Sequence, residues 1–121
     1  MSSRILSKLA LPVIPVLVVL IFPISAGLSL SRASAGEKHV VTQKGKAFST
    51  TELKVKVGDT VEFKNDDDVS HNVFSVSKVQ PFNTKMQTPG SEAAVTFASE
   101  GTVEVRCAIH PGMKLTIQVA K

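Results

Sequence analysis

Residues 53–63 read LKVKVGDTVEF, and this stretch decides the fold class. Apolar residues stand at every second position on both sides of a Gly58-Asp59 pair, with polar residues between them. Successive side chains of a β-strand point to opposite faces, so this period of two predicts two strands, each with one buried face. A Gly-Asp pair is typical of a tight turn, so we expect the two strands to form a hairpin.

The same alternation recurs along the rest of the chain, at residues 95–97, 103–106 and 115–119. Residues 71–76 are also rich in β-forming side chains, and turn signals such as Glu100-Gly101 separate the segments. No helical period of useful length follows residue 35. Short strands with turns at close intervals predict an all-β domain, a small antiparallel β-sandwich or barrel.

The first third of the chain differs from the rest. Residues 9–30 are mostly apolar and contain no acidic residue, Arg4 and Lys8 precede them, and Ala33 and Ala35 form a small-x-small pair. This is the layout of an export signal with its cleavage site. We therefore expect residues 1–35 to be a signal peptide and residues 36–121 to be one exported, periplasmic domain.

An uncleaved membrane anchor is the alternative, because the apolar run is long enough to span a bilayer. Three prolines within it, Pro12, Pro15 and Pro23, disfavour a stable spanning helix. We therefore expect cleavage before Gly36 and no membrane association afterwards.

Most of the positive net charge of the chain comes from the expected signal peptide. The whole chain has a formal net charge of +4, but removal of residues 1–35 takes away Arg4, Lys8 and Arg32 and no acidic residue. The remainder is close to neutral, so its composition gives no reason to expect a nucleic-acid partner.

Cys107 is the only cysteine. In an exported protein it is a free thiol, one half of an intermolecular bridge or a metal ligand. Cys107 has the same parity as Val103 and Val105, so its sulfur is expected on the inner face, at the end of that strand.

Two histidines and a methionine are expected at the same end of the core. Met113 shares parity with the apolar residues of 115–119, His110 lies in the turn between the two sulfurs, and His71 shares parity with Val73. One thiolate, two imidazoles and one thioether make the ligand set of a blue-copper site, whereas zinc usually takes more thiolates or a carboxylate. We therefore expect one copper ion that alternates between Cu(I) and Cu(II).

Several stretches together resemble the cupredoxins, the blue copper proteins, and among them the plastocyanin and amicyanin group. They cover nearly all of residues 36–121 and comprise Phe48, residues 53–63, Asn65-Asp66, residues 70–73 and residues 107–113. The Cys-x-x-His-x-x-Met spacing, with its proline after the histidine, is similar to the short ligand loop of amicyanins. The resemblance implies a Greek-key β-sandwich.

The resemblance also implies roles for individual residues. It implies four copper ligands, namely His71, Cys107, His110 and Met113. It further implies a hydrogen bond from Asn72 that stabilises the thiolate, and an electron port at the exposed edge of His110 beside Pro111. Two departures from the family pattern leave the docking partner undetermined: no aromatic residue stands two positions before Cys107, and Gly112 replaces a bulky loop residue.

We expect a monomeric type 1 copper protein that shuttles single electrons between redox proteins, such as a periplasmic dehydrogenase and a cytochrome-like donor or acceptor. The alternative is a copper carrier or delivery protein without a redox-shuttle role. A third hypothesis, an enzyme with Cys107 as nucleophile and a histidine as base, lacks an oxyanion loop and a third orienting residue. We therefore do not expect an enzyme.

Three further positions carry weaker expectations. His39 has no partner at a suitable spacing and is expected to be a solvated surface residue. Residues 66–68 are three consecutive aspartates and are expected to form a solvated turn. Met86 lies in an irregular stretch and is expected to cap the core; the alternative is that it competes with Met113 as the axial copper ligand.

Overall fold

The computed structural model describes residues 10–16, 18, 27 and 35–121. The chain divides into two units, Met1–Ser31 and Arg32–Lys121. The described residues of the first unit lie in neither helix nor strand, and most of the expected signal peptide falls outside the described residues. Among the described residues there is no helix long and apolar enough to cross a membrane.

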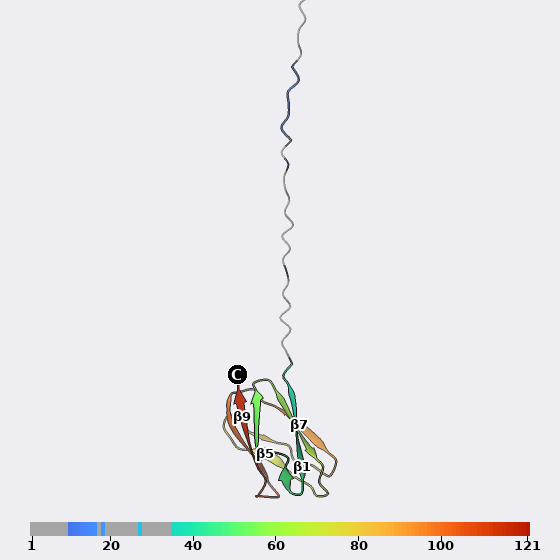
Figure 1. The fold of residues 1–121 in the computed structure, drawn as a ribbon, viewed down its shortest axis with the longest axis vertical. Helices are drawn as coiled ribbons and strands as arrows, with labels where there is room; N and C mark the ends of the chain where they lie inside the picture. The colour runs from blue at the N-terminus through green and yellow to red at the C-terminus, as the bar shows by residue number, and fades with distance from the viewer. Residues whose placement is uncertain (1–9, 17, 19–26, 28–34) are drawn as a thin grey trace, which may run out of the picture. The chain divides into compact units, whose positions relative to one another are not determined.

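The second unit is an all-β sandwich, as predicted (Figure 1). One sheet has the order β2-β1-β4-β7 and the other has the order β3-β9-β8-β5-β6. The strands are β1 (Lys38–Lys44), β2 (Ala47–Phe48), β3 (Glu52–Lys56), β4 (Thr60–Asn65), β5 (Val73–Ser75), β6 (Phe82–Asn83), β7 (Glu92–Thr96), β8 (Gly101–Cys107) and β9 (Lys114–Ala120).

The antiparallel prediction was wrong for two strand pairs, because both sheets are mixed. β1 runs parallel to β4, with Val41 opposite Phe63, and β3 runs parallel to β9, with Leu53 opposite Ile117. The remaining pairs of named strands are antiparallel.

The predicted hairpin of residues 53–63 was also wrong. β3 and β4 belong to different sheets, so the turn between them carries the chain across the sandwich. Two backbone hydrogen bonds join this turn to Phe97, one from the Gly58 N–H to the Phe97 carbonyl and one from the Phe97 N–H to the Asp59 carbonyl. Alternation of apolar residues shows that each strand has one buried face. Two such strands can be joined by a corner between two sheets as well as by a hairpin, so the pattern does not distinguish the two connections.

The core lies between the two sheets and is built by the alternating side chains. Val41, Val61 and Phe63 come from the four-stranded sheet, and Val103, Val105, Leu115 and Ile117 come from the five-stranded sheet. Phe82 stacks on Phe63 with ring centroids 5.9 Å apart and meets Phe97 edge-on at 6.2 Å. Cys107 and Met113 are 3% and 2% exposed, so both are buried as their parity predicted.

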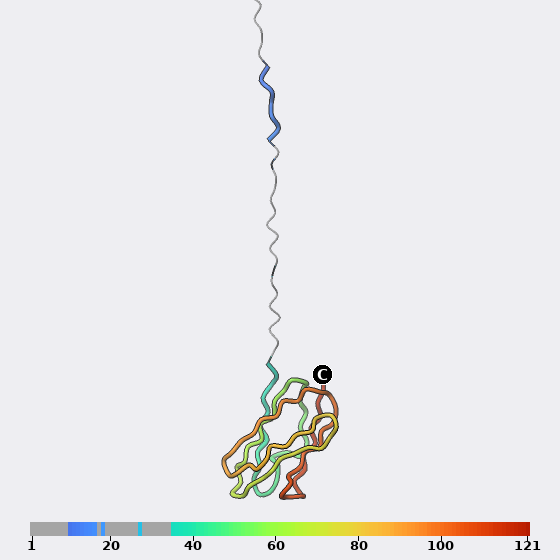
Figure 2. The backbone as a smooth tube through the Cα atoms, turned by 180° about the vertical axis from the view of Figure 1, so that it is seen from behind, coloured from blue at the N-terminus to red at the C-terminus, as the bar shows by residue number. Residues whose placement is uncertain are grey.

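Strand directions bring the predicted site residues to one end of the sandwich. β8 ends at Cys107 and β9 begins at Lys114, so the turn 108–113 between them lies at this end, as the tube in Figure 2 shows. β5 is antiparallel to β8, with Val73 opposite Cys107, so the segment that leads into β5 lies at the same end.

Candidate metal centre

The Cys107 sulfur is held at the end of β8 by the chain that enters β5. The backbone N–H of Asn72 points at the sulfur, with the nitrogen 3.4 Å from Sγ, and the Asn72 carbonyl accepts a bond from the Ala108 N–H at 2.9 Å. The predicted hydrogen bond from Asn72 is therefore present in the structure and comes from its main chain. The side-chain oxygen Oδ1 of Asn72 is buried without a hydrogen-bond partner in the described structure.

His71 is fully buried, and its main chain is fixed by a two-residue bridge to Gln87. The His71 N–H donates to the Gln87 carbonyl at 3.0 Å, and the Gln87 N–H donates back to the His71 carbonyl at 2.7 Å. The side chain of Gln87 donates through Nε2 to the Phe63 carbonyl and accepts through Oε1 from Gln43. This buried network connects the segment around His71 to both β1 and β4.

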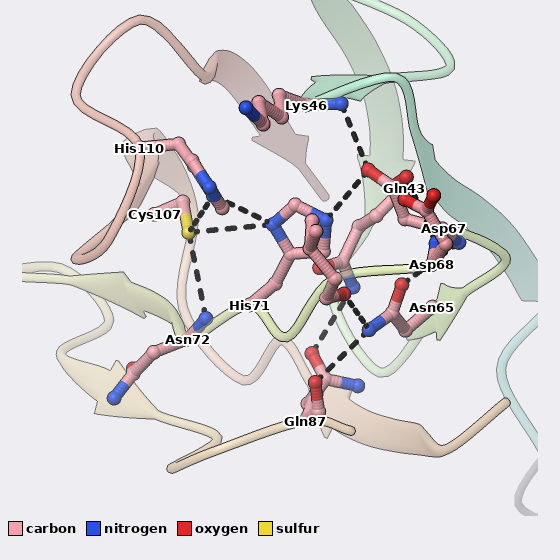
Figure 3. Close-up of polar contacts among 11 residues, drawn as sticks. Gln43, Lys46, Asn65, Asp67, Asp68, His71, Asn72, Gln87, Cys107 and His110 are labelled. Atoms are coloured by element: carbon pink, nitrogen blue, oxygen red, sulfur yellow. Dashed lines mark hydrogen bonds and ion pairs between the residues drawn. The ribbon is translucent and has the colours of Figure 1, made fainter. Parts of the chain in front are cut away.

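Asp67 orients the His71 ring (Figure 3). The ring nitrogen Nε2 of His71 donates to Oδ2 of Asp67 at 3.0 Å, and the backbone N–H of Lys46 donates to the same oxygen at 2.8 Å. These contacts hold the pKa of the Asp67 carboxyl well below its usual range, with the Lys46 N–H as the largest cause. Only 8% of the Asp67 side chain is exposed, so the prediction that residues 66–68 form a solvated turn was wrong for Asp67.

His110 lies in the turn between β8 and β9 and is half-buried. Its carbonyl accepts a bond from the Met113 N–H at 3.0 Å, which closes the turn. The His110 ring meets the His71 ring at a centroid distance of 4.8 Å, tilted by 60°. Pro111 and Ile109 beside it are exposed.

Three donor atoms converge on one point at this end of the core. Sγ of Cys107 lies 3.7 Å from Nδ1 of His71 and 3.7 Å from Nδ1 of His110, and the two nitrogens are 3.1 Å apart. The point equidistant from the three atoms lies about 2.0 Å from each, which is close to the bond lengths of first-row metal ions with imidazole and thiolate ligands. The three residues therefore fit a trigonal metal ion without rearrangement.

Met113 is buried at the same end, directly before β9 and three residues after His110. A thioether beside a two-histidine, one-cysteine plane is the donor chemistry of a blue-copper site. The structure thus brings His71, Cys107 and His110 together and places Met113 in the adjoining part of the core.

Two sequence-based expectations were wrong, and one supporting residue was not predicted. Met86 is 59% exposed and does not cap the core. His39 is not solvated, because its Nε2 donates to Asp59 at 2.9 Å and only 18% of its side chain is exposed. The role of Gln87 as a support of His71 was not predicted, because nothing in the sequence around Gln87 indicates that this irregular segment pairs with His71.

A β-sandwich with one buried cysteine sulfur and two converging imidazoles at its end has the donor set of the blue-copper class of proteins. The family model for copper binding proteins, plastocyanin/azurin family, matches residues 35–120. The chain belongs to this family.

Individual relatives agree with this assignment. The methylamine utilization protein MauL of Methylorubrum extorquens is 32% identical over 95 residues, which span 76% of this chain and 82% of that protein. Amicyanin of Paracoccus denitrificans is 36% identical over 70 residues, which span 55% of this chain and 53% of that protein. Among solved structures, an amicyanin variant with Cu(I) aligns over 68% of this chain and 81% of its own, with 32% identity and a TM-score of 0.64.

A purple cupredoxin from Nitrosopumilus maritimus aligns over 68% of this chain and 99% of its own, with 26% identity and a TM-score of 0.62. The cupredoxin resemblance of the sequence and the expectation of copper are therefore confirmed at the level of the family.

Proposed function

We propose that this protein is a type 1 copper electron carrier that passes single electrons between redox proteins. Its copper ligands are His71, Cys107, His110 and Met113. The observation that carries the proposal is the convergence of one sulfur and two ring nitrogens around a point about 2.0 Å from each atom. Bound copper supplies a one-electron couple between Cu(I) and Cu(II).

The surrounding residues keep the ligands still during that change. Asp67 fixes the His71 ring, Gln87 fixes its main chain, and the Asn72 N–H holds the sulfur. Ligands that do not move between two oxidation states lower the reorganisation that electron transfer requires. A rigid, mostly buried site favours electron transfer over copper delivery, because delivery needs ready exchange of the ion.

Electrons enter and leave through His110 and the turn beside Pro111. His110 is half-buried, whereas His71 is fully buried, so of the two rings His110 is the one that reaches the surface. A hollow beside Pro111 has Phe74, Val76 and Ala108 as further apolar lining residues, and Glu104 and Arg106 add charged groups to it. Exposed apolar side chains with charged residues beside them suit brief contact with a second redox protein.

The setting of the protein is part of the same proposal. Residues 1–35 are an export signal cleaved before Gly36, and residues 36–121 act as a periplasmic monomer. The partners are a dehydrogenase or cytochrome-like donor and acceptor.

The test uses the exported protein reconstituted with Cu(II). We expect an intense visible absorption from thiolate-to-copper charge transfer, complete bleaching by one electron per protein, and recovery of the colour on oxidation over many cycles without copper loss. Rapid loss of copper to an apo acceptor protein during cycling would favour the copper-delivery alternative. A protein that binds Cu(II) without the intense band would contradict the proposed ligand set.

A further inference from the structure

A second cluster of possible metal ligands lies at the other end of the sandwich. Glu37, His39 and Asp59 each offer one donor atom, and the three donor atoms lie within 4.8 Å of one another. The Asp59 turn bonds to the end of β9, because the Val57 N–H donates to the Ala120 carbonyl at 2.7 Å. β9 begins beside Met113, so the seven residues of this strand separate the two clusters by about 20 Å.

Asp59 is held in place by the main chain around it. Its side chain is 6% exposed, Oδ1 accepts from the Glu37 N–H at 2.8 Å, and Oδ2 accepts from the Lys56 N–H at 2.8 Å. These bonds keep the pKa of Asp59 below its ordinary value, with the Lys56 N–H as the largest cause, so the carboxylate is ionised at neutral pH. Main-chain donors that orient a carboxylate are a usual feature of metal sites in proteins.

His39 supplies the nitrogen donor. Its Nε2 lies 2.9 Å from Oδ2 of Asp59, a separation that two adjacent ligands of one metal ion can adopt with bonds of about 2 Å. The ring binds an ion as neutral imidazole with its proton on Nδ1, so the ion takes the place of the Nε2 proton. The ion then lies between the two atoms that the hydrogen bond now joins.

Glu37 completes the cluster from the first residues of the domain. The start of the domain packs tightly on the Asp59 turn, since a Cβ on Gly36 would lie 1.9 Å from the Gly58 carbonyl oxygen. The Glu37 side chain is exposed, and its carboxylate offers one oxygen within 4.8 Å of the donor atoms of His39 and Asp59. Lys54 and Lys56 line the same hollow and oppose a cation there.

We infer that Glu37, His39 and Asp59 bind one divalent transition-metal ion, separate from the copper centre. Two carboxylates and one imidazole without a thiolate suit Zn²⁺, with water in the remaining position. The ion cross-links the start of β1 to the turn between β3 and β4. It therefore stabilises the end of the sandwich that lies away from the copper centre.

The experiment titrates Zn²⁺ into the copper-loaded protein by calorimetry while the visible absorption is recorded. We expect one Zn²⁺ per protein, an unchanged blue colour and a higher thermal unfolding midpoint. His39→Gln keeps a donor for Asp59 but removes the ring nitrogen, and we expect it to abolish this binding. Glu37→Gln should weaken binding by about tenfold or more.

Two further variants serve as controls. Glu52→Gln removes one negative charge, as Glu37→Gln does. Glu52 is exposed at the first residue of β3, and the Asp59 turn follows the last residue of that strand, so this variant should bind Zn²⁺ like the parent protein. Lys54→Gln should strengthen binding, because it removes an opposing charge. The inference is overturned if calorimetry detects no Zn²⁺ binding to the parent protein, which would leave His39 and Asp59 as an ion pair only. It is also overturned if Zn²⁺ acts only by displacing copper, or if His39→Gln binds Zn²⁺ as tightly as the parent.

Discussion

At the scale of single residues, the contact between Asp67 and His71 orients one ring of the proposed copper centre. The carboxylate receives the N–H of Lys46 and the Nε2 proton of His71, which leaves Nδ1 of the ring free to face Cys107 and His110. A carboxylate in this position fixes the ring tautomer and raises the basicity of the metal-binding nitrogen.

Replacing Asp67 therefore affects copper binding through His71. We expect Asp67→Asn to weaken copper binding by about 10–100-fold, because the ring loses its charged partner. Loss of a negative charge close to the ion also favours Cu(I), so the reduction potential should rise. Competition with a chelator and voltammetry measure the two effects, and the thermal midpoint of the copper-free protein should fall as well.

Asp66→Asn is the matched control for this variant, because Asp66 is exposed in the same turn and, among the described residues, its carboxylate forms an ion pair with Lys64 alone, across 3.6 Å. Equal changes in both variants would mean that the turn acts through general charge and not through the His71 ring.

The two proposed sulfur ligands are expected to have unequal roles. We expect Cys107→Ser to abolish the intense visible band, since the thiolate makes the strong bond to copper. Met113→Leu should keep the band and raise the reduction potential, because a thioether would be a weak donor to copper. Met113 is 2% exposed and leucine has a similar volume, so the copper-free variant should lose less than about 1.5 kcal/mol of stability. A Cys107→Ser protein that keeps the blue spectrum would disprove the ligand assignment.

At the scale of elements, the sequence predicted which faces are buried but not which strands pair. Alternation correctly placed Cys107 and Met113 in the core, because parity depends only on the local backbone. The partner of β3 is β9, more than 50 residues away along the chain, and no local pattern specifies such a pairing. For the same reason Gln87 and Asp67 were missed as supports of His71, since their contacts depend on how separate segments meet.

The corner between β3 and β4 depends on an ionised Asp59. Its pKa is lowered first by the Lys56 N–H and then by the His39 ring, so the ionised form stabilises the folded state. This contribution is fully present above the ordinary value of 3.8 and is lost as the pH falls through the lower pKa of the folded state.

We therefore expect Asp59→Asn to destabilise the protein at neutral pH. The stability difference from the parent should shrink as the pH falls below about 4, because the parent then loses the same ionised group. Urea unfolding at a series of pH values measures this convergence, and the exposed Asp66→Asn variant should track the parent throughout. Parallel stability curves for the parent and Asp59→Asn would contradict a role for the ionised carboxylate.

At the scale of the whole domain, the two ends of the sandwich have different chemistry. One end carries a cysteine sulfur and two imidazoles under the exposed turn 108–113, and the other carries two carboxylates, one imidazole and lysines around the Asp59 corner. Exposed apolar side chains stand at both ends, because Ile109 is 44% exposed in the first turn and Val57 is 41% exposed beside the second. Replacing each of these two residues by lysine, one at each end, therefore locates the docking surface.

If redox partners dock over His110, a positive charge in place of Ile109 should weaken docking, and the same charge in place of Val57 should not. We expect Ile109→Lys to lower the second-order rate of electron transfer to a redox partner protein by about tenfold, which corresponds to about 1.4 kcal/mol of lost docking energy. The reduction potential and the visible spectrum should stay unchanged, because the Ile109 side chain is exposed and is not a ligand. Stopped-flow mixing of the reduced protein with an oxidised partner measures the rate. Val57→Lys should match the parent, and a slower rate in Val57→Lys than in Ile109→Lys would place the docking surface at the opposite end of the sandwich.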